Sequence, residues 1–339
     1  MTLRGKKNHL ALLLFLGVFG ALLTVATFYD LEISRILTRF SLKEGEYYTR
    51  NVFANFFEAA GMLPRYLLLA FASLSAGWFF HKAFPQKAVR ILSLVIGAGL
   101  AVHLLSGGFR DLIFYPMRHM IAEDADKARA AISAMTPTVY LISYFLSAGA
   151  VGLALYLTRN VPFDVWRRLA YFSMVVLMVQ VLSGSLVSAL KGYVDRPRFR
   201  SMNSDYGQAV GGFDLYVRWY EVTRNAEILR ATPLADYTDA FRSFPSGHTQ
   251  SAAISYSLIT FIDVFDVRNK KTKLALWLAP ILWTGLTAIG RIVAGAHFMS
   301  DVLIGGTIPF VLVILFRECY LRRFREIKEM YPFLVRKKP

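Results

Sequence analysis

Cationic, imidazole and carboxylate side chains gather in three short stretches of the sequence. Each stretch lies at the border of a long uncharged segment, so these side chains are not scattered at random along the chain. The stretches are ALKGYVDRPRFR, FPSGH and GRIVAGAHFMSD, and their candidate residues are Lys191, Arg196, Arg198, Ser246, Gly247, His248, Arg291, His297 and Asp301. If folding brings them together, these residue types could bind and cleave a phosphate ester.

The fixed cations suit a tetrahedral oxyanion such as phosphate, which an arginine can bind with a bidentate fork. The cations in the three stretches are Lys191, Arg196, Arg198 and Arg291. Ser246 and Gly247 stand where an apolar helix is expected to begin. A hydroxyl and unhindered backbone N–H groups at a helix start favour an anion. Together these residues predict an anion pocket.

The two histidines add reactive groups to that pocket. His297 and Asp301 are four residues apart and therefore share one helix face. The carboxylate could bond one ring nitrogen and hold the other toward the pocket, where an oriented imidazole is a nucleophile or a base. His248, from a different helix, could give a proton to a leaving alkoxide.

The elements that position these residues are predicted to be membrane helices, since 55% of the 339 residues are hydrophobic and 14% are aromatic. Six segments contain no Asp, Glu, Lys or Arg, and they are residues 10–29, 91–109, 130–158, 169–190, 243–262 and 274–290. Two shorter apolar segments, 66–80 and 302–316, have basic residues at their ends that could snorkel to the headgroups. Because about 20 apolar residues span a bilayer, we predict an all-α polytopic transmembrane bundle of about eight spans.

The distribution of charge orients these spans. With a cytoplasmic N-terminus, the inner segments are 1–9, 81–90, 158–168, 263–273 and 317–339, and they hold nearly all of the formal net charge of +16. The outer segments are 30–65, 110–137, 191–242 and 291–301, and together they are close to neutral. This is the positive-inside pattern, so we predict that both termini are cytoplasmic. The positive net charge therefore indicates a protein that lies in a membrane and not one that binds nucleic acid.

Each cluster alone has an ordinary explanation. Basic residues after a span are usually interfacial anchors, Pro-Ser-Gly before a helix is often a turn and cap, and a His with a carboxylate four residues on is often a satisfied polar pair. The predicted topology, however, places all three clusters at the same outer face. That convergence, obtained from charge alone, is what favours a site.

The chain is expected to have three parts. Residues 1–165 hold about four N-terminal spans, residues 166–318 form the core with the three clusters, and residues 319–339 are a basic cytoplasmic tail. The first apolar segment is longer than the core of a signal peptide, so we expect a retained helix. Cys319 is the single cysteine and has no partner in the chain for a disulfide.

The three clusters resemble the type 2 phosphatidic acid phosphatase superfamily, which carries Lys-x6-Arg-Pro, Pro-Ser-Gly-His and Ser-Arg-x5-His-x3-Asp. The second motif is intact at residues 245–248, and the third reads Gly290-Arg291-x5-His297-x3-Asp301 with Gly in place of Ser. In the first motif Lys191-x6 reaches Arg198, but Phe199 replaces the proline. Arg196-Pro197 supplies an Arg-Pro pair two residues early, although the spacing favours Arg198.

The resemblance implies roles for these residues. His297 would attack phosphorus to form a phosphohistidine, Asp301 would orient it, and His248 would protonate the leaving oxygen. The phosphate would be bound by Lys191, Arg198, Ser246, Gly247 and Arg291, with Arg196 as an additional candidate. Relatives commonly have six spans with the first motif after the third. Here it follows the fifth, so two upstream spans have no assigned role.

The resemblance predicts an integral membrane phosphatase of a lipid phosphate monoester or diphosphate, with no metal and no cofactor. A bacterial inner membrane with the site facing the periplasm or the exterior is the expected location. A zinc site built on the two histidines is disfavoured because the surrounding cations repel a divalent metal. A soluble phosphate ester as substrate, or a transport or anion-binding protein without catalysis, are the alternatives. The oligomeric state is not indicated.

Two stretches at the outer face have open interpretations. Residues 110–137 could be an interfacial helix, a lid or a plain connection. The aromatic stretch FDLYVRWYEV, residues 213–222, could lie at the membrane interface near a lipid's entry route or could pack against the protein.

Overall fold

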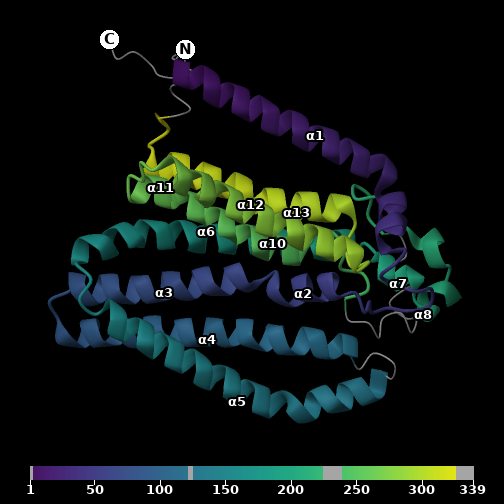
Figure 1. Ribbon diagram of the computed structural model, residues 1–339, viewed down its shortest axis with the longest axis horizontal. Coiled ribbons are helices and arrows are strands. Elements are labelled where there is room, and N and C mark those ends of the chain that lie inside the picture. The colour runs from purple at the N-terminus through teal and green to yellow at the C-terminus, as the bar shows by residue number, and fades with distance from the viewer. Residues whose placement is uncertain (1–2, 121–124, 224–238, 326–339) are drawn as a thin grey trace.

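The protein is a bundle of long helices that lie side by side (Figure 1). The computed structural model describes residues 3–120, 125–223 and 239–325, and within these ranges no β-strand occurs. The long helices are α1 (Leu3–Thr38), α3 (Leu63–Ala83), α4 (Lys87–Met120), α5 (Ala125–Thr158), α6 (Phe163–Val194), α12 (Lys270–Val293) and α13 (Met299–Phe316). The all-α prediction is confirmed for the described residues.

Shorter helices connect the long ones. They are α2 (Val52–Ala60), α7 (Phe199–Asn203), α8 (Asp205–Ala209), η1 (Gly212–Leu215), α10 (Gly247–Ala253), η3 (Ile254–Thr260), α11 (Phe261–Val264) and η4 (Arg317–Leu321). α2 starts at Asn51, whose side chain accepts a hydrogen bond from the Ala54 amide, and leads through Gly61 into α3. α7, α8 and η1 lie together at one end of the bundle (Figure 1).

Seven helical stretches of the described chain are long and apolar enough to cross a membrane, one fewer than the eight predicted. They are His9–Thr38, Val52–Ala83, Lys87–Met117, Ile132–Thr158, Phe163–Asn203, Lys270–Val293 and Met299–Leu321. The predicted span 243–262 is the exception, because it is divided among α10, the 3-10 helix η3 and α11.

Local hydroxyl groups accompany this interruption. Ser255 Oγ donates to the Ala252 carbonyl and Thr260 Oγ1 donates to the Ser257 carbonyl, each three residues back. Such bonds compete with the α-helical ladder. A 3-10 helix rises about 2.0 Å per residue against about 1.5 Å in an α-helix, so the run 247–264 is about 30 Å long, comparable to a bilayer core.

The N-terminal helices and the motif-bearing helices share one hydrophobic core. Leu69 of α3, Phe172 and Val176 of α6, Ile254 of η3 and Val313 of α13 are all buried in it. α3 and α4 also approach closely at two glycines. A Cβ added to Gly97 would lie 2.7 Å from the Ser73 carbonyl oxygen and 2.9 Å from Gly77 Cα, so only glycine permits this contact.

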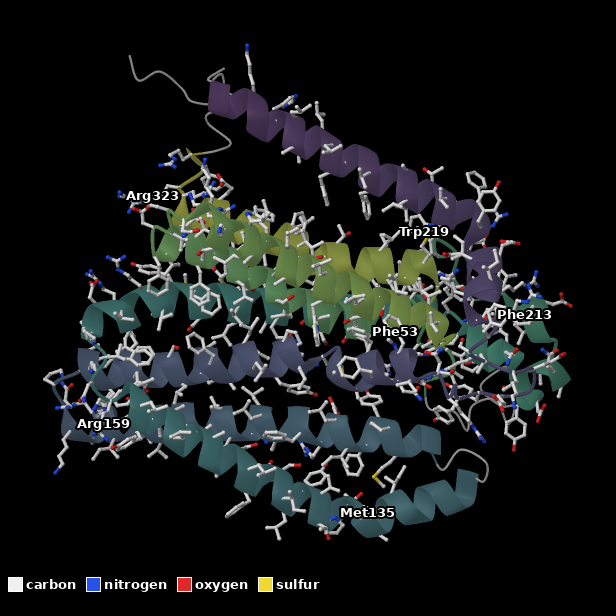
Figure 2. The ribbon with its side chains drawn as sticks, in the orientation of Figure 1. Phe53, Met135, Arg159, Phe213, Trp219 and Arg323 are labelled. Atoms are coloured by element: carbon white, nitrogen blue, oxygen red, sulfur yellow. The ribbon has the colours of Figure 1, made fainter. Side chains whose placement is uncertain are left out.

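The two ends of the bundle differ in what they carry. The start of α1 and the end of α13 lie at the same end (Figure 1), an arrangement that fits the seven apolar stretches only if the run 247–264 also crosses the membrane. Arg159 and Arg323 lie at that end, whereas Phe213 and Trp219 lie at the opposite one (Figure 2). Most of residues 110–137 continue α4 and begin α5, so within the described residues this stretch is not a separate interfacial helix. Residues 121–124 lie outside the described part.

A cysteine-labelling experiment tests whether the interrupted run 247–264 crosses the membrane. Asp214 and Arg268 are both exposed and flank this run. In a Cys319→Ser background, Asp214→Cys and Arg268→Cys should react with a membrane-impermeant maleimide from opposite sides of the membrane. Permeabilised cells, in which both variants should react, provide the control. Labelling of both from the same side of intact cells would show that the run does not cross.

Candidate active site

The three sequence clusters meet at the end of the bundle that carries α7, α8 and η1 (Figure 1). Lys191 lies in the last turn of α6, and Arg196 and Arg198 lie in the link to α7. Ser246 is the N-cap of α10, and His297 lies in the turn between α12 and α13. The backbone N–H of Ser246 donates to the Asp301 carbonyl at 2.9 Å, which joins the second cluster to the third.

His297 is held by a backbone carbonyl. Its Nδ1 lies 2.6 Å from the Ser243 carbonyl oxygen, and its Nε2 lies 3.4 Å from Nη1 of Arg198. A carbonyl only accepts, so we assign the ring proton to Nδ1 and the lone pair to Nε2. Burial lowers the pKa of His297 well below its usual value, and the nearby cations Arg198, Lys191 and Arg291 lower it further. The imidazole is therefore neutral at ordinary pH, with Nε2 available as a nucleophile.

Asp301 does not form the expected hydrogen bond with the His297 ring, since Oδ2 is 3.6 Å from Nδ1. That oxygen instead accepts from the Phe298 backbone N–H at 2.8 Å and from the Ser243 hydroxyl. The Ser243 carbonyl occupies the position at Nδ1. Asp301 therefore orients His297 through the loop that carries it and through Ser243.

Arg196 and Arg198 differ in their surroundings. Arg196 is completely buried, and its guanidinium contacts Asp301 Oδ1 at 2.7 Å, Asp30 Oδ2 at 3.1 Å, the Ser300 hydroxyl at 2.9 Å and the Val217 carbonyl at 2.7 Å. Arg198 faces His297. Its Nε donates to the Asp239 carbonyl at 2.7 Å. The arrangement favours Arg198 over Arg196 as the phosphate ligand, as the motif spacing predicted.

Lys191, Gly247 and Arg291 complete the cationic surroundings. Lys191 Nζ donates to the Arg242 carbonyl at 2.6 Å, and a Cβ added to Gly247 would lie 3.7 Å from Lys191 Cε. Arg291 is fully buried, and none of its three guanidinium nitrogens makes a hydrogen bond to the described residues. It makes an ion pair with Glu58 at 2.9 Å. That ion pair is made by Nη1, so Nε and Nη2 remain available for an oxyanion.

His248 lies at the start of α10 beside Tyr115 of α4, with the two ring centroids 5.4 Å apart. Its Nε2 is buried and makes no hydrogen bond to the described residues. His248 is close enough to contribute to the lowered pKa of His297, after burial and the cations. The two histidines are therefore neighbours in one pocket.

The sequence interpretation missed two buried carboxylates from the N-terminal helices. Asp30 of α1 contacts Arg196, and Glu58 of α2 contacts Arg291 and, at 3.8 Å, Arg200. Both are at most 3% exposed. A carboxylate at the edge of an apolar run is a signal that could have pointed to them, because such a group needs a partner inside the protein.

Asp239 was also missed, and it clamps two arginines of the first cluster. It contacts Arg198 Nη2 at 3.3 Å and Arg200 Nη2 at 2.8 Å, and it accepts from the Tyr47 hydroxyl. Burial alone would raise the pKa of Asp239, but the charges of Arg198 and Arg200 hold it well below its usual value. Asp239 therefore stays ionised and fixes the outer side of Arg198.

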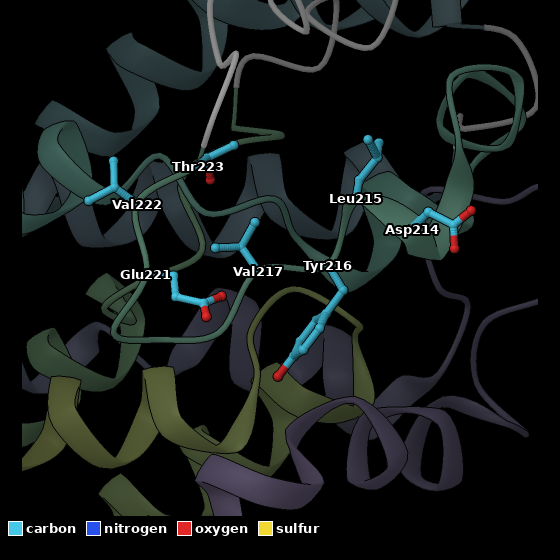
Figure 3. A pocket seen from close by; sticks show the side chains of 7 residues that line it. All are labelled: Asp214, Leu215, Tyr216, Val217, Glu221, Val222 and Thr223. Atoms are coloured by element: carbon cyan, nitrogen blue, oxygen red, sulfur yellow. The ribbon is translucent and has the colours of Figure 1, made fainter.

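A cavity of about 710 Å³ opens beside the site (Figure 3). It is lined by residues 214–217 and 221–223, from the aromatic stretch noted in the sequence. None of the nine candidate residues lines it, but Tyr216 and Val217 do, and both contact Arg196. Trp219 packs inward, donating from Nε1 to the Thr27 hydroxyl of α1 at 3.0 Å, whereas Tyr220 is half exposed. Trp219, at least, therefore packs against the protein, as one of the two interpretations of this stretch expected.

The different environments of the two arginines predict different effects on stability. Arg196→Ala leaves Asp30 and Asp301 buried together without a counter-charge and should lower the free energy of unfolding by about 3–5 kcal/mol. Arg198→Ala is the matched control, and it should cost less because Asp239 keeps Arg200. Denaturant unfolding of the detergent-solubilised protein measures both. Equal losses would contradict the structural role of Arg196.

The region that holds these residues is similar in sequence to known proteins. A family model described as the PAP2 superfamily matches residues 168–325. Phosphatidylglycerophosphatase B of Bacillus subtilis (strain 168) is 37% identical over 89 residues, which are 25% of this chain and 43% of that protein. The chain thus spans less than half the length of this curated relative. No solved structure matches the chain. Residues 168–325, which include all nine candidate residues, belong to the PAP2 superfamily, and the chain is an integral membrane protein with multiple apolar helices.

Proposed function

We propose that the chain is an integral membrane phosphatase that hydrolyses a phosphate monoester or diphosphate of a lipid through a phosphohistidine intermediate. The observation that carries the proposal is the placement of His297 Nε2, which faces Arg198 at 3.4 Å while Nδ1 is occupied by the Ser243 carbonyl. This geometry leaves one nucleophilic nitrogen directed at the groups that would hold a phosphate.

The phosphate group would be held by the cations around that nitrogen. Arg198 and Lys191 both donate to the Arg242 carbonyl, and Arg291 is near enough to His297 to lower its pKa together with them. Gly247 offers backbone without a side chain at the start of α10. Ser246 caps α10, with its hydroxyl accepting from Thr249. Positive groups fixed before the reaction stabilise the charge that develops on the phosphoryl oxygens. These cations supply this charge without a metal ion.

The reaction follows from the two histidines. Nε2 of His297 bonds to phosphorus as the bond between phosphorus and the lipid oxygen breaks. His248, which enters this step as the imidazolium beside the bound phosphate anion, donates a proton to that leaving oxygen and becomes neutral. A water molecule then attacks phosphorus and gives its proton to His248. The bond between Nε2 and phosphorus breaks, inorganic phosphate leaves, and both histidines return to their starting states.

The lipid as substrate class is supported by the position of the site. The pocket lies at one end of a bundle of apolar helices, where a headgroup can reach it while acyl or prenyl chains remain in the bilayer. The name of the Bacillus subtilis relative points to phosphatidylglycerol phosphate as the first substrate to test. The basic residues at the opposite end support a site at the outer face, which in a bacterial inner membrane is the periplasmic side.

Phosphate release by the purified protein tests this function. Wild type should release inorganic phosphate from phosphatidylglycerol phosphate in detergent micelles, with EDTA present. His297→Ala should reduce the rate on the order of 10³-fold or more, because it removes the nucleophile. His103→Ala is the matched control and should retain wild-type activity, since His103 is exposed and contacts Tyr144 away from the site.

Four results would contradict the proposal in different ways. Wild-type activity in His297→Ala would show that His297 is not the nucleophile. Loss of wild-type activity in EDTA would make the reaction metal-dependent. Turnover of glycerol phosphate but of no lipid in a panel of phosphatidic acid, phosphatidylglycerol phosphate and undecaprenyl diphosphate would favour a soluble substrate, and no turnover at all would favour an anion-binding protein.

A further inference from the structure

Asp30 is a buried carboxylate on a helix that is otherwise little buried. Only 6% of the most apolar stretch of α1 is buried, and the neighbouring residues Phe28 and Tyr29 are 70% and 57% exposed. Asp30 is 1% exposed. The helical path breaks at Tyr29 (φ −124°, ψ 15°), immediately before it. α1 therefore directs a single carboxylate into the protein at the end where the site lies.

The partners of Asp30 all belong to the site. Oδ1 accepts from the Ser300 backbone N–H at 2.9 Å, and Oδ2 accepts from the Ser300 hydroxyl and from Arg196 Nη2 at 3.1 Å. A buried carboxylate without such partners is costly. Both partners lie within residues 168–325, whereas Asp30 lies far outside that region.

Asp30 and Asp301 share one guanidinium group. Arg196 contacts Asp301 through Nη1 and Asp30 through Nη2, and both ion pairs are fully buried. Nε of Arg196 is occupied by the Val217 carbonyl. The arginine is therefore fixed on three sides, and Asp30 supplies the only carboxylate besides Asp301 that it contacts among the described residues.

The hydrogen-bond network continues from Asp301 to His297, whose Nε2 is the proposed nucleophile. With Oδ1 held by Arg196, the carboxylate directs Oδ2 at the Phe298 N–H and the Ser243 hydroxyl. The Ser243 carbonyl then accepts from His297 Nδ1. A displacement of Arg196 would move Asp301, Ser243 and the imidazole in turn.

We propose that Asp30 is a positioning residue of the phosphatase site, acting through Arg196 and Asp301 on His297. The inference rests on the proposed function and gives α1 a role in it: the first helix completes a network that the matched region does not complete alone. Asp30 touches none of Lys191, Arg198 and Arg291, so its loss should affect the alignment of His297 more than the binding of phosphate.

The test is the steady-state hydrolysis of phosphatidylglycerol phosphate by Asp30→Asn. The asparagine keeps the size of the side chain and removes its charge. We expect kcat to fall about 10- to 100-fold, since small displacements of a reacting group have effects of this size. KM should change by less than about 2-fold, because the phosphate ligands are untouched. Glu32→Gln is the matched control: the same chemical change at an exposed position of the same helix should leave kcat and KM unchanged.

The outcomes separate this inference from the function on which it rests. If the wild type is active and Asp30→Asn has the same kcat, the inference alone is overturned. The same holds if Asp30→Asn changes only KM. A wild type that releases no phosphate would overturn the proposed function and the inference with it. If Asp30→Asn does not fold, Asp30→Glu keeps the charge and lengthens the side chain by one methylene. A kcat equal to wild type in a folded Asp30→Glu would likewise overturn the inference.

Discussion

The geometry at the end of the bundle that carries the candidate site depends on one buried guanidinium, that of Arg196. It lies between Asp30 of α1 and Asp301 of α13 and is closed by the Ser300 hydroxyl and the Val217 carbonyl. Removing the guanidinium from this group would leave both carboxylates buried without a counter-charge. The interaction therefore fixes α1, the link after α6 and the start of α13 in one arrangement, and His297 lies in the turn that leads into α13.

The same principle extends to the arginines that are proposed to bind phosphate. Glu58 of α2 pairs with Arg291, and Asp239 pairs with Arg198 and Arg200. Each carboxylate offsets part of the repulsion among cations that a phosphate would otherwise have to overcome alone. The helices before residue 168 thus supply two of the counter-charges, which links the N-terminal half of the chain to the proposed chemistry.

Sequence reasoning selected residues that carry their own chemical signature, and the structure brings these residues to one end of the bundle. The two histidines, the lysine and the arginines stand at motif spacing, and the choice of Arg198 over Arg196 agrees with the contacts. The Ser243 carbonyl could not be found in this way, because any residue supplies a backbone oxygen. Asp30 and Glu58 looked like ordinary residues at span ends, since their partners lie more than a hundred residues away. The 3-10 helix at residues 254–260 could not be predicted, because its serines and threonine are uncharged and the segment has the pattern of one apolar helix.

The central claim is that His297 Nε2 forms a covalent bond to phosphorus. Rapid quenching of the wild-type enzyme during turnover of phosphatidylglycerol phosphate, followed by peptide mass spectrometry under alkaline conditions, tests it most directly. The account predicts phosphate on the peptide that contains His297, and none on that peptide in His297→Ala. Turnover by an active enzyme with phosphate trapped on His248 or on another side chain would contradict it.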